Sequence, residues 1–536
     1  MEIVISFALA LSISTVLVPF LMKMAPAIGL VDRPDGDRKV HDKPVPRCGG
    51  LSIAIAVIIP AMLWLREVSS LLGFFIGAAI IVVFGFFDDR HELNFKWKFL
   101  GQILAVSVFL MGDLVITKTP FMGLGDLLPW LSYPVIALFI VGVINAVNMS
   151  DGLDGLAAGS SLLSLVFIAF LGYFAGEYSL MLVAVATCGA LLGFLRFNTH
   201  PATVFMGDTG SQFLGYVAAC LAIMVTQSDS LPVSPMVAIL VVGLPILDTL
   251  SVMLLRMRDG QSPFQPDKRH LHHQFLAVGM QHYQAVAALY LLNFLLLGLC
   301  YFVRYQSDIV VFLSYLLFCA TTLALIGFLK HSAPVRKLRL EQRADRRNQF
   351  FRKLDWYYHN GPLVIQCLMG AVWIACIWFS VTPVRMPLPV IIVILVLIAV
   401  LWVMASKASI FNRIIFYLAS LSTLFLASYE SNLAGWQFYV DAIIGILVIL
   451  LVLSMRMTRR EEFSLDTQDI LIVLLLVLAP LLSFGFGDSR AVIDDVMRLA
   501  ILLYASEYLV SRFKSLGIAR LLAILALVLV VFRSLT

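Results

Sequence analysis

The stretch Asn145-Ala-Val-Asn148-Met-Ser-Asp151-Gly-Leu-Asp154-Gly-Leu156 sets two amides and two carboxylates between two apolar runs, 133–143 and 162–173. A charged side chain near the centre of a bilayer costs about 2.5–3.5 kcal/mol on insertion scales, so acids clustered at the edge of a membrane span indicate function. Gly and Asp are also ordinary turn residues, and a solvated turn between two spans is the alternative. Because further acids recur at similar edges along the chain, we expect this stretch to be functional.

The composition predicts an all-α polytopic membrane protein. Of the 536 residues, 61% are hydrophobic and 13% are charged, whereas a soluble domain has about 45–50% apolar and 25% charged residues. Many apolar runs are long enough to cross a hydrocarbon core of about 30 Å. The net charge of +5 carries no nucleic-acid signature. The seven cysteines form no C-x-x-C pair, which argues against a disulfide framework and a thiolate zinc site.

Apolar runs predict eleven spans in residues 1–330 and about seven more in residues 361–536. The first eleven lie near 3–22, 51–65, 69–87, 99–116, 131–147, 160–175, 180–195, 212–225, 236–255, 284–303 and 309–329. Lysine and arginine concentrate in alternate loops. The positive-inside rule then places the loops 23–47, 90–98, 256–269 and 330–353 in the cytoplasm and the N-terminus outside.

A basic segment that ends in aromatic residues, 331–360, divides the predicted core from the C-terminal bundle. It is either a topogenic loop or a linker with an interfacial helix that lies on anionic headgroups. The bundle 361–536 has no cluster of polar loop residues. A regulatory, scaffolding or lipid-handling role is open for it, as is contact with a second copy of the chain or with later polysaccharide-assembly enzymes.

The polar clusters all fall on the predicted cytoplasmic side. Besides the opening stretch, they are Lys39–Gly50, Asp88-Asp89 with Lys96 and Lys98, Arg196-Phe-Asn198, Phe205-Met-Gly-Asp208-Thr-Gly-Ser211, and Asp267-Lys-Arg269-His270-Leu-His272-His273. Carboxylates beside basic residues would repel an anionic substrate unless a metal bridged them. Carboxylate and amide oxygens suit Mg²⁺, with Mn²⁺ as the alternative. Lysine and arginine can clamp the remaining phosphate oxygens, so the clusters predict phosphoryl-type transfer at a membrane surface.

Each motif also has a plainer interpretation. The pair Asp88-Asp89 is compatible with a helix cap, and Phe205 with a packing residue. The histidine motif lacks a fourth soft ligand for zinc, so phosphate contact or loop structure is favoured. Asp248 lies within a predicted span, where it either bonds a neighbouring helix or supports the site.

Four motifs in this order resemble the polyprenyl-phosphate N-acetylhexosamine-1-phosphate transferases over about residues 1–330. They are Asp88-Asp89, the opening stretch, Phe205–Ser211 and Arg269–His273. The Arg-His-x-His-His form looks like the WecA and TagO branch, which uses UDP-N-acetylglucosamine. The MraY branch usually has three consecutive histidines, and Leu271 interrupts that run here.

The resemblance implies a role for each matching residue. Metal contacts are implied for Asp208 and Asn148. The implied catalytic residues, with Asp88 as base or orienter and Lys98 on a phosphate, are Asp88, Asp89, Asp151 and Lys98. The implied substrate contacts are Asp154, Asn198 and Phe205 for uridine, and Arg269, His270, His272 and His273 for the diphosphate or sugar.

The implied reaction moves N-acetylglucosamine-1-phosphate from UDP-N-acetylglucosamine to undecaprenyl phosphate in the bacterial inner membrane. It would release UMP into the cytoplasm and initiate a lipid-linked cell-envelope polysaccharide, such as cell-wall polymer or the O-antigen of lipopolysaccharide. Another UDP-N-acetylhexosamine is one alternative. A lipid-linked sugar flippase is another, although a transporter should carry its polar groups near the bilayer midplane. A CDP-alcohol phosphotransferase is disfavoured, since no D-G-x-x-A-R run occurs.

Overall fold

The computed structural model describes residues 2–32, 44–65, 71–112, 129–262 and 269–351, with single residues at 118, 120, 471 and 474. Contacts divide the chain into two compact units, one of which contains Glu2–Lys337 and Leu465–Leu478. That unit carries every motif found in the sequence. Apart from 471 and 474, the C-terminal bundle predicted for 361–536 lies outside the described residues.

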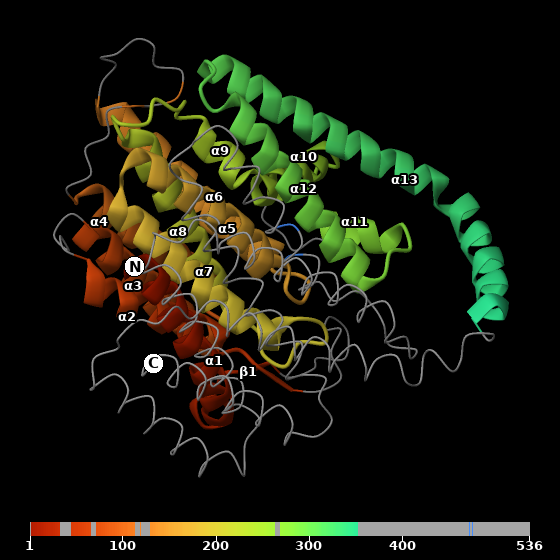
Figure 1. Ribbon diagram of the computed structural model, residues 1–536, viewed down its shortest axis with the longest axis horizontal. Coiled ribbons are helices and arrows are strands. Elements are labelled where there is room, and N and C mark those ends of the chain that lie inside the picture. Colours follow the sequence, from red (N-terminus) through yellow and green to blue (C-terminus); the bar gives the residue numbers. More distant parts are fainter. Residues whose placement is uncertain are drawn as a thin grey trace, which may run out of the picture. The chain divides into compact units, whose positions relative to one another are not determined.

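Helices make up most of the described chain, and the predicted all-α polytopic fold is confirmed (Figure 1). The helices are α1 (Glu2–Ile28), α2 (Gly49–Trp64), α3 (Leu72–His91), α4 (Phe95–Leu110), α5 (Pro129–Ser150), α6 (Leu156–Ala175), α7 (Tyr178–Asn198), α8 (Gly207–Gln227), α9 (Val237–Val241), α10 (Gly243–Arg258), α11 (Leu271–Ala277), α12 (His282–Val303) and α13 (Asp308–Phe351). Two short strands, β1 (Val31–Asp32) and β2 (Val45–Pro46), pair antiparallel.

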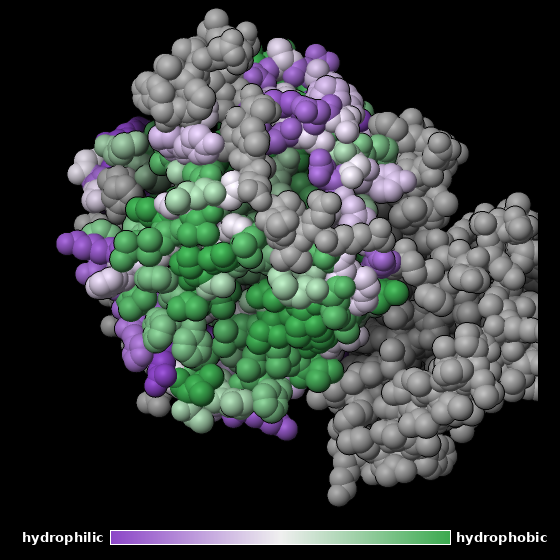
Figure 2. All heavy atoms as spheres, turned by 90° about the vertical axis from the view of Figure 1, so that its left-hand side faces the viewer, coloured by the Kyte–Doolittle hydropathy of each residue, from purple (hydrophilic) through white to green (hydrophobic). Residues whose placement is uncertain are grey.

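Each of the eleven predicted N-terminal runs corresponds to helical structure, but not every run is one long helix. Within the described ranges, eight helices are long and apolar enough to cross a membrane. Helices α2 and α4 have 16 residues each, which is about 24 Å at 1.5 Å per residue. The ninth run is divided at Val242 into α9 and α10. Figure 2 shows one face of the molecule, on which a broad apolar belt lies between polar residues above and below it.

Helix α8 is the central helix of this unit. Its apolar window is 94% buried, and it packs against α2, α3, α5 and α6. Glycines allow the backbones to approach closely at its first turn. A Cβ at Gly50 of α2 would collide with the backbone of Gly210, and one at Gly85 of α3 would collide with Thr209. The start of α8 is therefore held at a fixed position by two neighbouring helices.

The long helix α13 passes through the predicted linker. It runs without a break from Asp308 to Phe351, so residues 331–351 continue the last predicted span of the core as helix. The predicted position of this segment on lipid headgroups, and the domain boundaries at 330 and 360, stay predictions.

Candidate active site

Asp89 fixes the N-terminus of α8, where Asp208 lies. Its Oδ1 accepts a hydrogen bond from the Asp208 backbone N–H at 2.7 Å. Its Oδ2 accepts from the Thr209 N–H at 3.0 Å and from the Thr209 hydroxyl at 2.5 Å. A carboxylate at this position satisfies free N–H groups and complements the helix dipole. The geometry makes Asp89 a positioning residue for Asp208, and the catalytic role that the resemblance implied for it stays a prediction.

Gly207 makes this contact possible. Its φ of +69° lies in the left-handed region that favours glycine. A Cβ there would also collide with the Asp89 carboxylate. On the other side, the Phe205 N–H donates to the Pro46 carbonyl at 2.8 Å, and the Gly49 N–H donates to the Phe205 carbonyl at 3.0 Å. The loop before α8 is thus held by β2 and α2 on one side and by α3 on the other.

Lys98 bridges two carboxylates from different helices. Its ammonium lies 2.5 Å from Asp88 Oδ2 and 2.9 Å from Asp208 Oδ2. The other Asp88 oxygen accepts from the Leu93 N–H at 2.8 Å. Glu92, with a φ of 49°, turns the chain between α3 and α4, so that two residues ten positions apart face each other. The Asp88 side chain is only 1% exposed, whereas Lys98 and Asp208 are about 30% exposed and open to a ligand.

The amides of the opening stretch are tied to α4 and α8. Asn148 Oδ1 accepts from the Ser211 hydroxyl at 2.6 Å. Asn145 exchanges hydrogen bonds with Gln102, and the Gln102 amide also donates to Gln212 at 3.0 Å. We predicted no role for Gln102 or Gln212; their only signal was a polar residue inside an apolar run.

Asp151 lies just beyond α5, beside the other acids. Burial, followed by the negative charges of Asp208, Asp154 and Asp89, raises the pKa of Asp151 to about 7. A carboxyl group is perturbed in this way when nearby like charges disfavour its ionised form. The acids predicted from three separate motifs therefore lie close enough to interact.

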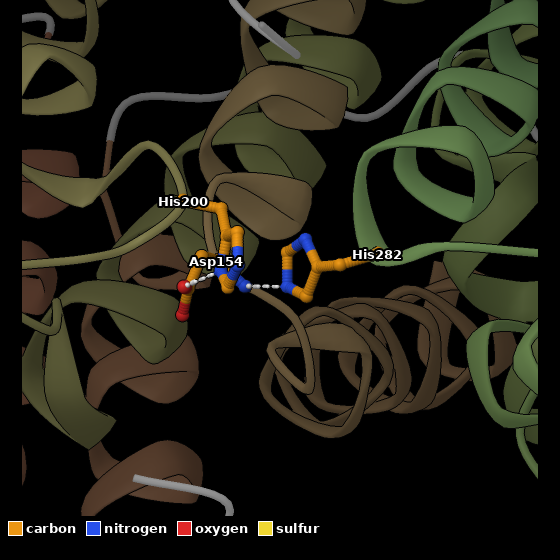
Figure 3. A group of neighbouring side chains, drawn as sticks. All are labelled: Asp154, His200 and His282. Carbon is orange, nitrogen blue, oxygen red and sulfur yellow. Dashed lines mark hydrogen bonds and ion pairs between the residues drawn. The ribbon is translucent and has the colours of Figure 1, made fainter. Parts of the chain in front are cut away.

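Asp154 is held by two histidines that belong to none of the sequence motifs (Figure 3). Its Oδ2 lies 2.7 Å from His200 Nδ1 and accepts from the Ala202 N–H at 3.1 Å. The Asp154 backbone N–H donates to His282 Nε2 at 3.2 Å. His200 precedes α8 and His282 begins α12, so no short motif links them.

These three side chains have the composition of a metal site but not its orientation. Their ligand atoms all lie within 4.8 Å of one another. The two imidazole rings, however, stack with centroids 4.1 Å apart and only 18° between their planes. Nearly parallel rings do not direct their nitrogen lone pairs at a common point, as a tetrahedral zinc site requires. The arrangement is better described as a hydrogen-bonded clamp on Asp154.

Asn198 is buried, and its amide bonds to the backbone at both ends. Oδ1 accepts from the Gly155 N–H at 3.0 Å, and Nδ2 donates to the Val204 carbonyl at 2.9 Å. It thereby joins the loop that carries Asp154 to the loop that carries Phe205, which is partly exposed. The contacts predicted for Asn198 and Phe205 with uridine stay predictions.

Asp248 positions the histidine motif. Its Oδ1 accepts from the Leu271 N–H at 2.6 Å and its Oδ2 lies 3.1 Å from His270 Nδ1, with both residues buried. The sequence left two interpretations of Asp248 open. Its contacts with Leu271 and His270 favour the one in which Asp248, on α10, supports the site. His272 packs on Gly152 of the acidic loop. Burial, and then His273, lowers the pKa of His272 to about 4, so the ring is neutral at pH 7.

Arg269 and His273 lie at the edge of this motif. Arg269 pairs with Asp259 and bonds Gln261, just beyond the end of α10, and both Arg269 and His273 are partly exposed. The histidine motif and the acidic loop are in contact through His272 and Gly152. The diphosphate or sugar contacts that the resemblance implied for the motif stay predictions.

Known proteins are similar to this chain over the part that carries these motifs. A family model described as glycosyl transferase family 4 matches residues 71–226, from the turn before α3 to the last turn of α8. A probable undecaprenyl-phosphate N-acetylglucosaminyl 1-phosphate transferase of Bacillus subtilis (strain 168) is 38% identical over 299 residues, or 55% of this chain and 83% of that protein. The chain belongs to glycosyl transferase family 4.

Other relatives show the breadth of the family. A decaprenyl-phosphate N-acetylglucosaminephosphotransferase of Mycolicibacterium smegmatis is 34% identical over 287 residues, covering 48% of this chain and 71% of that protein. A phospho-N-acetylmuramoyl-pentapeptide-transferase of Caldicellulosiruptor bescii is 31% identical over 317 residues, covering 55% and 94%. The resemblance inferred from the motifs is confirmed, and this family 4 member is an integral membrane phosphotransferase of the sugar-1-phosphate type.

Proposed function

We propose that this family 4 transferase moves N-acetylglucosamine-1-phosphate from UDP-N-acetylglucosamine to undecaprenyl phosphate and releases UMP. The reaction would take place on the cytoplasmic side of the bacterial inner membrane and initiate a lipid-linked cell-envelope polysaccharide. The observation that carries the proposal is the Asp88–Lys98–Asp208 bridge at the start of α8. In one place the bridge combines the buried carboxylate of Asp88, the Lys98 ammonium, which can bind a phosphate, and the partly exposed carboxylate of Asp208, which can bind a metal.

The residues present fit a divalent metal. Oxygens of Asp88 and Asp208 already converge on one cationic group, the Lys98 ammonium. Burial, followed by the negative charges of Asp208, Asp154 and Asp89, raises the pKa of Asp151, so several acids share this region. Mg²⁺, with Mn²⁺ as the alternative, would be held by Asp208 and Asn148 with Asp151 close by. When bound, such an ion supplies neutralisation of phosphate charge.

The side chains of the bridge orient the acceptor. Lys98 can hold oxygens of the lipid phosphate or the diphosphate. Asp88, buried beside it, orients the lipid phosphate or takes its proton. A phosphate oxygen of the acceptor then forms a bond to the β-phosphorus of the donor, and the bond from that phosphorus to the UMP oxygen breaks. UMP leaves with the electron pair, and positioning and charge neutralisation supply the catalysis. A two-step route through an aspartyl-phosphate on Asp88 is the alternative.

The donor would lie between the Asp154 clamp and the histidine motif. We assign Asp154, Asn198 and Phe205 to uridine, and Arg269, His270, His272 and His273 to the diphosphate and sugar. The names of the Bacillus subtilis and Mycolicibacterium smegmatis relatives support N-acetylglucosamine as the transferred sugar. Leu271, which interrupts the histidine run, separates this chain from the muramoyl-pentapeptide branch, and another UDP-N-acetylhexosamine is the alternative donor.

The test is a transfer assay on the purified full chain with radiolabelled UDP-N-acetylglucosamine, undecaprenyl phosphate and Mg²⁺. We expect labelled lipid and UMP in equal amounts, no product with a chelator, and a loss of at least about 100-fold in Asp208→Asn and Asp88→Asn. Asp229→Asn is the matched control, because that side chain is 98% exposed and far from these motifs in sequence. Full activity in the chelator or in Asp208→Asn would refute the proposal.

A further inference from the structure

The proposed reaction assigns no role to the polar segment Lys39–Gly50, whose described part includes Arg47. Arg47 follows β2 directly, and its backbone N–H donates to the Leu30 carbonyl at 2.9 Å. Two residues later, the Gly49 N–H donates to the Phe205 carbonyl at 3.0 Å. The backbone on both sides of Arg47 is therefore fixed, by the hairpin before it and by the loop that leads into α8 after it.

Asp32 orients the guanidinium of Arg47. Asp32 pairs with Val45 in the two-stranded ribbon, so Arg47, two residues further on, is its diagonal neighbour. The Arg47 Nη2 group donates to Asp32 Oδ1 at 2.7 Å, with the two side chains 25% and 8% exposed respectively. This bond comes from one of the two terminal nitrogens of a guanidinium that carries five N–H donors in all. Asp32 is too buried to reach a ligand, but it holds a partly exposed cation in one direction.

The oriented guanidinium lies near two residues of the proposed site. The charge of Arg47 interacts with the carboxylate of Asp208, which we assign to the metal. Pro46, directly before Arg47, accepts a hydrogen bond at 2.8 Å from the N–H of Phe205, which we assign to uridine. In a UDP-sugar, the group that joins the uridine to the metal-bound part of the diphosphate is the phosphate on the nucleoside. A guanidinium matches a phosphate in charge and in hydrogen-bond geometry.

We propose that Arg47 binds the nucleoside-linked phosphate of the donor and stabilises it as it leaves with UMP. This inference rests on the proposed function. An acceptor phosphate oxygen bonds the β-phosphorus, the bond from that phosphorus to the bridging oxygen breaks, and the bridging oxygen keeps the electron pair. The phosphate of UMP thereby gains negative charge, and a fixed cation beside it stabilises the transition state more than the ground state. Asp32 is the positioning residue for this cation.

The first experiment measures the binding of UMP and of uridine to the purified full chain by calorimetry in the presence of Mg²⁺. Arg47→Met should weaken UMP binding about 10- to 100-fold, the loss expected for a hydrogen bond between charged groups. Uridine binding should stay the same, because uridine lacks the phosphate. Arg47→Lys keeps the charge but not the planar fork, so it should weaken UMP binding less than Arg47→Met does.

The second experiment measures transfer kinetics. Arg47→Met should lower kcat about 10- to 100-fold and leave the KM for undecaprenyl phosphate unchanged. Asp32→Asn, which weakens the hold on the guanidinium, should give the same pattern with a smaller loss. Lys23→Met is the control, because it removes an exposed cation near the end of α1, close in sequence to the hairpin. It should change neither kcat nor UMP binding.

Three results would overturn the inference. If Arg47→Met binds UMP as tightly as the unchanged protein, Arg47 does not contact this phosphate. If uridine binding falls by the same factor as UMP binding, Arg47 only stabilises the hairpin. If the KM for undecaprenyl phosphate rises while UMP binding is unchanged, the cation belongs to the acceptor. An unchanged protein that transfers no sugar phosphate from UDP-N-acetylglucosamine would instead refute the proposed function, and the inference with it.

Discussion

Replacing Asp89 by asparagine separates a positioning role from a chemical one. The new side chain would keep one oxygen for the Asp208 N–H, but its amide nitrogen would face the Thr209 N–H and cannot accept a hydrogen bond from it. The Thr209 hydroxyl can rotate and accept instead. The substitution therefore removes one buried hydrogen bond to a charged group and the charge at the N-terminus of α8.

The size of the effect follows from these contacts. A hydrogen bond to a charged group contributes about 1.5–3 kcal/mol. A charge at a helix N-terminus contributes about 0.3–1 kcal/mol, and up to about 2 kcal/mol when it is partly buried. We expect Asp89→Asn to lower the free energy of unfolding by about 2–4 kcal/mol. Transfer activity should fall with it, because Asp208 loses its support.

The assay is a denaturant or thermal unfolding curve of the detergent-purified protein, measured beside transfer activity. Asp88→Asn is the comparison, since it keeps the Leu93 hydrogen bond and leaves Lys98 paired with Asp208. It should lose activity at less than half the cost in stability. If Asp89→Asn unfolds like the unchanged protein yet is inactive, Asp89 acts directly in the chemistry and the positioning role is wrong.

Three further predictions concern other parts of the site. Gly207→Ala should abolish activity because its Cβ would meet the Asp89 carboxylate. Gly176→Ala is the control: its φ is +70° with no atom within 4 Å, so it should cost only about 1 kcal/mol of unfolding free energy. Equal melting temperatures for the two variants would contradict this prediction. Lys98→Met should lower kcat. It should also lower the Mg²⁺ concentration that gives half-maximal activity, because the ammonium no longer competes with the metal for the two carboxylates. An unchanged Mg²⁺ requirement would show that Lys98 and the metal occupy separate positions. The pKa of His272, about 4, lies below its ordinary value of 6.5, so the unfolded chain binds the proton first as the pH falls. The contribution of His272 to stability is therefore complete above about pH 6.5 and is lost toward pH 4. Between about pH 7 and 4.5, the melting temperature should fall less steeply for His272→Gln than for the unchanged protein.

The fold was predictable because span length and apolar composition act locally. The eleven N-terminal runs are contiguous in sequence, and each one corresponds to helical structure. The division of the ninth run at Val242 was not predictable, since the apolar pattern continues through it and only the surroundings decide that the helix is interrupted. The side of the membrane that each loop faces is still a prediction from the charge distribution.

The site was predictable as a set of motifs but not as a set of contacts. Asp88 and Asp89 look equivalent in sequence, yet consecutive helical residues point about 100° apart. One therefore meets Lys98 and the other meets the first turn of α8. His200 and His282 belong to no motif, because their shared partner Asp154 brings them together only in the folded chain.

The two sides of the site are anchored with very different stiffness. Asp208 is seated where the backbones of α2 and α3 touch α8, so it cannot shift without moving three helices. The histidine motif is attached to α10 through the buried carboxylate of Asp248. Displacing the motif would break the two contacts of Asp248, the bonds of Arg269 with Asp259 and Gln261, and the packing of His272 on Gly152, all of which involve side chains. Entry of a bulky donor should therefore deflect the histidine side while the acid side stays still, so that each donor is brought to a fixed reaction centre.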